Sequence, residues 1–467
     1  MPKTKHILFI VIVLFGFNSI SQLEKHIWHF NTTNRGLFFD PSNSFIPVIT
    51  NTSYTPFGGE GCGVVTHPVT GELQFYSDGM TCIDRNDDVM PNGSGLSGLS
   101  SSISNGKVCL VPGYCDRYYL FSNSYTHEAN TSGSVYYSIV DMSLVGNGVV
   151  GNELGDIAAG QKNIFVATGI SEAIEIIPKA NSHEYWLMIG KNVANQIEIY
   201  NVTGAGISLH TTYNLPYVLS DMRAMVYCQQ NKKVALASCI EMNPTVIMDF
   251  DPATGFVTST FQIPGTPFGM SPLYWMGTNA LEWSPDGTKL YIGKYRTSSP
   301  SGGGKLYHYD LDLLANPPQI LVNLGTNSSI VSRGLRLAPD GKIYYMYTNP
   351  SGVVQQLAVV HNPNGDFASC NFQSNFLDMG INLGNSNSFP FFLNWNNTLP
   401  AITDTLISFA CELPASFLFT PMAGVTDAEN DNISFSVDNI SGGTVSVSGS
   451  DIIFTPTPGY AGITSFE

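Results

Sequence analysis

Two copies of one hairpin signature constrain the fold of this 467-residue chain more than any other feature of its sequence. Residues 281–292 read LEWSPDGTKLYI and residues 335–345 read LRLAPDGKIYY, so each copy has alternating apolar residues around a Pro-Asp-Gly turn. Proline presets the backbone φ of the turn, and glycine accepts the positive φ that closes it. One hairpin repeated at roughly the spacing of a propeller blade predicts a β-propeller. Because a propeller is a platform for many chemistries, this pattern predicts an architecture and leaves function open.

Further strand pairs recur along the chain from residue 73 onward. Counted with the two hairpins they give six units, and residues 27–30 are placed to close a seventh with residues 389–393. Such closure removes exposed strand edges from the ring. No long stretch repeats apolar residues at helical spacing, and residues 310–314 offer one short turn at most. We therefore predict an all-β fold: a seven-bladed β-propeller, with six or eight blades as the alternatives, and a partial C-terminal β-sandwich.

The N-terminus has the features of a secretory signal peptide. Lys3 and Lys5 supply positive charge, residues 7–17 form an apolar run too short for a membrane span, and residues 19–21 suit cleavage. An uncleaved anchor is the alternative. No other stretch of the sequence approaches the length of a membrane span.

The chain divides into three predicted parts. A turn-rich stretch at residues 394–400 interrupts the strand pattern, and the character of the sequence changes after it. We expect a signal peptide over residues 1–21, a propeller domain over residues 22–396 and a sandwich domain over residues 400–467.

The chain is acidic, because 20 Lys and Arg residues against 36 Asp and Glu residues give a net charge of −16. Loss of Lys3 and Lys5 with the signal peptide leaves 18 basic residues and a net charge of −18. Such a surface repels nucleic acid and anionic lipid. Only 12% of the residues are charged and 43% are hydrophobic, which is typical of an extracellular all-β protein. We expect a secreted or cell-surface protein with no nucleic-acid partner and no membrane span after signal removal.

Eight cysteines, an even number in a chain predicted to be exported, point to disulfide bonds. Sequence alone leaves their pairing open. Pairing of near neighbours predicts four bonds: Cys62–Cys82, Cys109–Cys115, Cys228–Cys239 and Cys370–Cys411. The third pair is favoured because its cysteines flank a hairpin turn at residues 229–233. No Cys-x-x-Cys spacing is present and the histidines are scattered, so the sequence indicates no zinc site.

Residues 60–79, residues 86–102 and the run YYSIVDMSL at residues 136–144 resemble the opening of secreted β-propeller proteins from Bacteroidetes-type bacteria, of the lactonase or YVTN-like kind. The two Pro-Asp-Gly hairpins and residues 389–392 fit the same group. The shared motifs are mostly structural. The resemblance therefore implies a secreted propeller and no particular reaction.

The C-terminal part resembles a bacterial cadherin-like or immunoglobulin-like repeat in residues 424–435, 442–445 and 453–462. Such repeats continue with one more strand, so we expect the natural chain to extend beyond Glu467. The resemblance implies interdomain calcium at an acidic turn, where carboxylates at alternate positions suit a hard cation. The alternative is a solvated turn. The residues of this turn are Asp427, Glu429 and Asp431.

Five ionisable residues fall at comparable places, just before or at the start of predicted inner strands: Glu60, Glu172, Asp221, Glu282 and Arg333. In a propeller these places surround the central channel, where converging acids can hold a metal, as in lactonase-like propellers. The alternative is that these polar side chains satisfy one another. Trp275 lies in a loop-like stretch and is the candidate for stacking on a sugar ring.

The sequence contains no serine nucleophile elbow and no phosphate-binding glycine loop, and we assign no catalytic residue. We expect a secreted or cell-surface adhesion module, whose propeller presents loops to an extracellular protein or glycan and whose sandwich acts as a calcium-stiffened stalk. A metal-dependent, lactonase-like propeller hydrolase and a lectin-like glycan binder are the alternatives.

Overall fold

The chain forms two compact units in the computed structural model, residues 21–395 and residues 1–20 with 396–467, and each is described by itself. The structure describes the following residues: 9–13, 25–30, 34–51, 60–67, 70–125, 133–180, 182–192, 195–273, 276–296, 302–325, 327, 329–349, 351, 356–380, 383, 389–392, 405–409, 417–419, 443–448, 451–456 and 464–466.

The described elements are β-strands and short 3-10 turns, as predicted. The turns are η2 (Pro41–Asn43) and η4 (Leu311–Leu313), and η4 falls in the stretch expected to form one turn. The strands of the larger unit are β2 (Ile27–His29), β3 (Arg35–Asp40), β4 (Ile46–Asn51), β5 (Gly63–Thr66), β6 (Leu73–Ser77), β7 (Thr81–Asp84), β8 (Val89–Ser94), β9 (Val108–Leu110), β10 (Arg117–Asn123), β11 (Gly133–Asp141), β12 (Asp156–Ile157), β13 (Ile164–Pro178), β14 (Tyr185–Lys191), β15 (Gln196–Thr203), β16 (Gly206–Asn214), β17 (Met222–Cys228), β18 (Lys233–Ser238), β19 (Val246–Asp251), β20 (Phe256–Gln262), β21 (Thr278–Trp283), β22 (Lys289–Lys294), β23 (Lys305–Asp310), β24 (Gln319–Asn323), β25 (Ser332–Leu337), β26 (Ile343–Tyr347), β27 (Gln356–Val360), β28 (Phe372–Asp378) and β29 (Phe391–Phe392).

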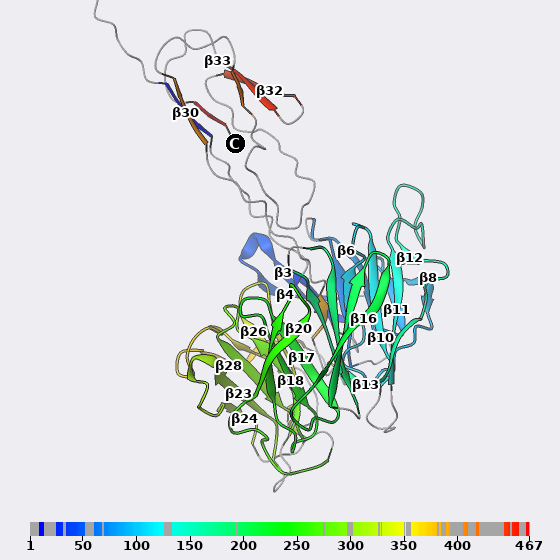
Figure 1. Ribbon diagram of the computed structural model, residues 1–467, viewed down its shortest axis with the longest axis vertical. Helices are drawn as coiled ribbons and strands as arrows, with labels where there is room; N and C mark the ends of the chain where they lie inside the picture. The colour runs from blue at the N-terminus through cyan, green and yellow to red at the C-terminus, as the bar shows by residue number, and fades with distance from the viewer. Residues whose placement is uncertain are drawn as a thin grey trace, which may run out of the picture. The chain divides into compact units, whose positions relative to one another are not determined.

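These strands form a β-propeller. Three sheets are simple four-stranded meanders, β17–β18–β19–β20, β21–β22–β23–β24 and β25–β26–β27–β28. Strand β13 of the preceding sheet contacts β17, and the first strands of the three meanders contact one another, β17 with β21 and β21 with β25. In Figure 1 these sheets follow one another in chain order, in the green to yellow part of the ribbon. Radial repetition of four-stranded antiparallel sheets defines the propeller fold.

Five sheets of the larger unit have four or more strands, so the seven predicted blades are not confirmed. The other two of the five are β29–β5–β6–β7–β8 and an eight-stranded sheet that runs from β9 to β16. Strand β13 is 15 residues long and pairs with both β11 and β14, which joins two strand groups into that one sheet. A sixth sheet, β2–β3–β4, has three strands.

Both Pro-Asp-Gly hairpins are present as predicted. Trp283 pairs with Leu290 across the first turn, which joins β21 to β22, and the second turn joins β25 to β26. Gly287 and Gly341 have φ values of 73° and 74°. This left-handed conformation is accessible to glycine at little cost, so the turn chemistry read from the sequence is the chemistry the backbone uses.

The two ends of the larger unit meet, but in a different way from the one predicted. The ring of Trp28 in β2 lies 5.0 Å from that of Phe389 and 5.7 Å from that of Phe392. The backbone of Phe391 and Phe392 pairs in parallel with β5, whereas β2 belongs to a different sheet. Side-chain packing on Trp28 thus brings the ends together, while the hydrogen bonds go to the neighbouring sheet.

The hydrophobic core lies between the faces of neighbouring sheets. One cluster joins Ala235 and Ile247, from the sheet of β17, to Trp283, Leu290 and Ile292, from the sheet of β21. Burial of each large apolar side chain contributes about 1.5–3 kcal/mol. Alternating strand residues supply both faces of each sheet, which is why the strands carry nearly continuous apolar runs.

The disulfide prediction is wrong for the described cysteines, which are thiols. Cys228 pairs opposite Lys233 at the turn end of the β17–β18 hairpin, whereas Cys239 follows Ser238 at the other end. Cys239 lies six residues beyond Lys233, so roughly 20 Å of strand separates the two cysteines, far beyond the reach of a disulfide. Cys62 precedes β5 and Cys82 lies in β7, with β6 between them. Cys411 lies outside the described residues.

The smaller unit contains two three-stranded sheets among its described residues, β30–β1–β34 and β31–β33–β32. A sandwich built from them is not confirmed. Asp427, Glu429 and Asp431 lie outside the described residues. Strand β1 falls inside the predicted signal peptide and pairs with β30 and β34. Cleavage of that peptide stays a prediction. The strands are β1 (Phe9–Val13), β30 (Thr405–Phe409), β31 (Phe417–Phe419), β32 (Gly443–Ser448), β33 (Asp451–Pro456) and β34 (Thr464–Phe466).

No helix in the described part of the chain has the length and apolar character that a membrane crossing requires.

Candidate functional site

Four inner strands of the propeller carry a break in register, in the middle of β13 and near the beginning of the other three. In β17, β21 and β25 the break leaves one residue without a partner in the neighbouring strand, and in β13 it spans three residues. A β-bulge of this kind turns a side chain away from the direction that strict alternation would give it. Each break contains a polar residue near the central channel: Glu172, Arg223, Asn279 and Arg333.

Arg223 gathers these residues into one network. Its Nη1 donates to both carboxylate oxygens of Glu172 at 2.7 and 2.8 Å, its Nη2 donates to Glu60 at 2.6 Å, and its Nε donates to Asn279 Oδ1 at 2.6 Å. The Asn279 amide donates in turn to the carbonyl oxygen of Arg333 at 2.5 Å. The network therefore ties together inner strands of several blades.

The Arg223 side chain is 1% exposed, and that of Glu172 is 2% exposed. Burial alone would lower the pKa of Arg223, but the carboxylates of Glu172 and Glu60 outweigh it and raise that pKa. The guanidinium is thus permanently charged, and it sits between the two acids that the sequence marked as metal-ligand candidates.

The predicted ring residues fall into different places. Glu60 and Glu172 meet at Arg223, and Arg333 joins them through its backbone. Asp221 accepts a hydrogen bond from the hydroxyl of Tyr125 and lies outside the Arg223 contacts described above. Glu282 belongs to a second layer. Trp275 lies outside the described residues, as does the acidic turn proposed for calcium.

The second layer begins three residues further along the same strands, which corresponds to roughly 10 Å at about 3.3 Å per residue. Glu175 follows Glu172 in β13 and accepts a 2.5 Å hydrogen bond from Lys107. Arg336 follows Arg333 in β25. A repeated offset of three residues thus places two polar rings along one channel.

Glu282 is the most strongly desolvated acid of this second layer. Its carboxylate accepts backbone hydrogen bonds from Trp283 and Leu337, both at 3.1 Å, and lies 3.8 Å from Nη1 of Arg336. Burial raises the pKa of Glu282, and the nearby Arg336 and the two N–H donors only partly oppose that rise. Lys107 shows the opposite case, since burial lowers its pKa against the pull of Glu175.

The second layer lines a cavity of about 290 Å³. Phe391 lies between two of its cations, with Lys107 Nζ 4.5 Å and Arg336 Cζ 5.0 Å from the ring centre. The lining runs from buried Arg223 to exposed Gln229 and Gln230, so solvent exposure increases toward the far end of β17. A small polar ligand is the kind of molecule that such a lining suits.

The arrangement favours charge pairing over metal binding. Glu60 and Glu172 both face Arg223, and Glu175 faces Lys107. Within the residues that the structure describes, no group of three or more His, Cys, Asp and Glu side chains is placed to hold a metal ion. The alternative stated for the predicted ring, mutual satisfaction of its polar side chains, is what the geometry shows for Glu60 and Glu172.

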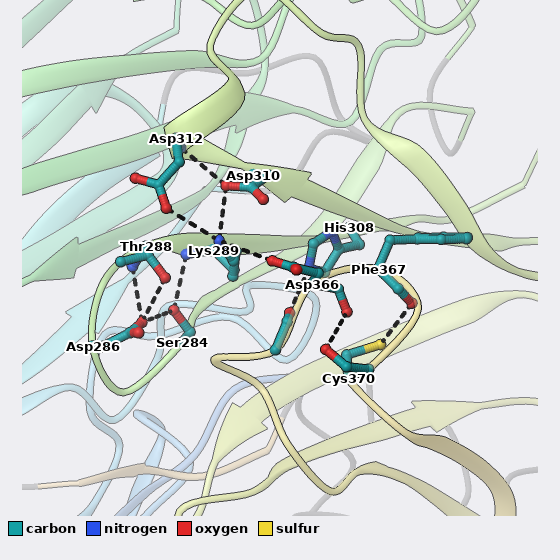
Figure 2. Close-up of polar contacts among 12 residues, drawn as sticks. Ser284, Asp286, Thr288, Lys289, His308, Asp310, Asp312, Asp366, Phe367 and Cys370 are labelled. Atoms are coloured by element: carbon teal, nitrogen blue, oxygen red, sulfur yellow. Dashed lines mark hydrogen bonds and ion pairs between the residues drawn. The ribbon is translucent and has the colours of Figure 1, made fainter.

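A second charged cluster lies beside the first Pro-Asp-Gly turn and is centred on Lys289 (Figure 2). The Lys289 side chain is 4% exposed and its ammonium lies 2.8, 3.4 and 3.9 Å from Asp310, Asp312 and Asp366. Asp286 accepts hydrogen bonds from the Thr288 backbone and the Ser284 hydroxyl, which closes the turn. The acids surround a lysine, so this cluster holds strands together and offers no cation site.

Lys107, Glu175, Asn279 and Arg336 were not singled out from the sequence. One signal was available: polar residues recur three apart within otherwise apolar strands, at Glu172 and Glu175, Asn279 and Glu282, and Arg333 and Arg336. In a regular strand, residues three positions apart face opposite sides of the sheet. A bulge between them can bring both side chains to the same side, so this spacing indicates a shared channel only once the bulge is known.

No family model matches the sequence, and no curated protein matches it. A solved structure from Bacteroides fragilis, provisionally assigned as a 6-phosphogluconolactonase, is 11% identical, with 84% of this chain and 100% of that chain covered and a TM-score of 0.46. A protein from Bacteroides uniformis with the same provisional assignment is 10% identical, with coverages of 80% and 97% and a TM-score of 0.45.

The BP39L lectin from Burkholderia pseudomallei is 8% identical, with 59% of this chain and 70% of that chain covered and a TM-score of 0.38. All three similarities are too distant to carry an activity or a ligand to this chain. The strand topology itself establishes that the larger unit is a β-propeller.

Proposed function

We propose that the protein is a secreted or cell-surface binding module of the adhesion type. A seven-bladed propeller, with the eight-stranded sheet counted as two blades and β2–β3–β4 as one, presents loops to an extracellular protein or glycan. The cadherin-like repeat that follows acts as a stalk, stiffened by calcium at Asp427, Glu429 and Asp431.

The observation that carries the proposal is the Arg223 network. Its acids sit where a channel hydrolase would need open metal ligands, yet Glu60 and Glu172 each hold the same buried guanidinium. Breaking a buried pair of this kind costs about 3–5 kcal/mol, so the acids are unsuited to exchange partners during a reaction. The buried end of the channel is therefore held rigidly, which suits a binding platform.

The loops that contain Met242, Met270 and Leu273 supply a candidate contact surface. Met270 is 82% exposed, Leu273 60% and Met242 46%. The backbone of Met242 donates to Ser271 at 3.2 Å, and Ser271 donates to Glu241, whose carboxylate pairs with buried Lys294. Exposed apolar side chains on loops that hydrogen bonds and a buried ion pair hold in place are typical of interaction surfaces.

The test compares two loop variants of the full chain on a glycan array and on a panel of immobilised extracellular proteins. We expect Met270→Ser with Leu273→Ser to weaken the strongest interaction at least tenfold. Val150→Ser is the matched control, because Val150 is 88% exposed but lies in another loop. Equal binding by both variants, or a blank result on both surfaces, contradicts the proposal.

Metal analysis of the purified protein distinguishes the calcium-stalk hypothesis from the hydrolase alternative. Calcium that is lost from the Asp427→Asn, Asp431→Asn variant supports the stalk. A transition metal that is lost from Glu60→Ala or Glu282→Ala, together with hydrolysis of a lactone, supports the metal-dependent hydrolase in its place. Binding confined to sugars on the array favours the lectin-like alternative.

A further inference from the structure

Basic residues outnumber acidic ones among the residues that line the channel cavity. The whole sequence has 20 basic and 36 acidic residues, but four basic residues and two acidic ones line the cavity. An acidic protein that gathers cations in one enclosed place produces a local field that attracts small anions. These lining residues are Lys25, Lys107, Arg223, Arg336, Glu175 and Glu282.

Two of the four cations already face acids, and with Glu60 and Glu172 counted the cavity and its paired side chains contain four cations and four acids. Lys107 is paired with Glu175 at 2.5 Å, and Arg223 is held by Glu60 and Glu172 at the buried end of the cavity. Lys25 and Arg336 remain, and both act on the same carboxylate, Glu282. Two cations facing one acid leave a surplus of one positive charge near Arg336.

Arg336 has hydrogen-bonding capacity that its surroundings do not use. Its contact with Glu282 spans 3.8 Å, which is longer than a hydrogen bond. Its Nε is buried and has no hydrogen-bond partner among the described residues. The guanidinium is fixed in place by its packing on the ring of Phe391, 5.0 Å away. Because Nε has no exposed surface while the side chain is 21% exposed, the donors left for a ligand are those of Nη1 and Nη2, and two such donors match the two oxygens of a carboxylate.

We propose that the channel cavity binds a small organic carboxylate, with Arg336 holding its oxygens and Lys25 supplying the second positive charge. The surplus of one charge suits a monoanion better than a phosphate dianion. The volume of about 290 Å³ lies at the small end of the range for ligand pockets, about 300–1,000 Å³, so the ligand is no larger than a monosaccharide. Burial raises the pKa of Glu282, which weakens its competition for Arg336.

The site is separate from the Met270 and Leu273 loop surface, so the two proposals fail independently. The test is isothermal titration of the full chain with D-glucuronate, lactate and succinate. D-glucose is the neutral control for glucuronate, because it has the same ring and a hydroxymethyl group in place of the carboxylate. Inorganic phosphate distinguishes a carboxylate site from a general oxyanion site.

We expect at least one carboxylate to bind, glucose not to bind, and Arg336→Gln to weaken binding at least tenfold. Lys25→Gln should weaken it by a smaller factor, and it serves as the second variant if Arg336→Gln fails to fold. Arg117→Gln is the matched control, since Arg117 is 39% exposed and pairs with Asp141 away from the lining of the cavity. No heat with any of the three carboxylates, equal binding of glucose, unchanged binding by both variants, or tighter binding of phosphate overturns the proposal.

Discussion

Replacing Arg223 by methionine tests whether the network at the channel is a structural tie. The substitution keeps the length of the aliphatic stem and removes the guanidinium that pairs with both Glu60 and Glu172. Removal of one partner from a buried ion pair costs about 3–5 kcal/mol, because the remaining charge stays desolvated. Every 1.4 kcal/mol is a factor of ten, so the unfolding equilibrium should shift by about a hundred-fold to a few thousand-fold.

Urea unfolding followed by tryptophan fluorescence measures this change in the propeller alone. All five tryptophans of the chain lie within residues 21–395, so the smaller unit does not contribute to the signal. Arg117→Met is the control, because its pair with Asp141 is 39% exposed on the arginine side. An exposed pair contributes about 0–1 kcal/mol, so this variant should unfold close to the original protein.

A rescue experiment separates charge from shape. Adding Glu60→Gln and Glu172→Gln to Arg223→Met removes the stranded carboxylates and should recover most of the lost free energy of unfolding. A loss below about 1 kcal/mol for Arg223→Met, or no recovery in the triple variant, would refute the idea that uncompensated buried charge sets the cost.

Three further predictions concern the turns, the thiols and the buried acid. Gly287→Ala should lower the free energy of unfolding in urea more than Gly341→Ala does. Both positions have a positive φ, which costs about 1–2 kcal/mol for a residue with a β-carbon. Only at Gly287 would that β-carbon also lie 2.7 Å from the Sγ of Cys228. Equal losses would show that the cysteine contact is harmless. In the native protein a thiol reagent should label exposed Cys115 first, and a reducing agent should leave the midpoint of unfolding unchanged; a drop on reduction would restore the disulfide hypothesis for the described cysteines. Glu282 has a raised pKa in the folded state, so its contribution to stability is present at low pH and is lost as pH rises through that pKa. The free energy of unfolding of Glu282→Gln relative to the original protein should therefore increase from pH 4 to pH 8, and a flat difference would contradict the burial of the charged form.

Local features of the sequence predicted the parts of the fold that local chemistry decides. The Pro-Asp-Gly hairpins formed where they were predicted, because proline fixes φ and glycine accepts a positive φ wherever they stand in a chain. Tyr118 pairs with Val140 and Phe121 with Tyr137, in two strands that alternate apolar residues in the sequence. Trp28, Trp186 and Trp283 are buried within strands of the same kind.

The disulfide pairing failed for a related reason. Nearness in sequence is a poor guide to nearness in space within a β-sheet, because a hairpin separates residues at its two ends by the full length of its strands. Cys228 and Cys239 flank a turn in the sequence and lie at opposite ends of the hairpin in the structure. Only the register of β17 against β18 reveals this.

For this protein, the order of amino acids alone determined an all-β chain of repeated hairpins with acidic and basic residues near the inner strands. The tertiary structure decided which of those charges meet. Bulges in β13, β17, β21 and β25 changed the facing of Glu172, Arg223, Asn279 and Arg333, and the ring then brought Glu60 to the same guanidinium from 163 residues away. The physical reason is that turn geometry depends on a few neighbouring dihedral angles, whereas the pairing of buried charges depends on strand register and ring closure, which many distant contacts set together.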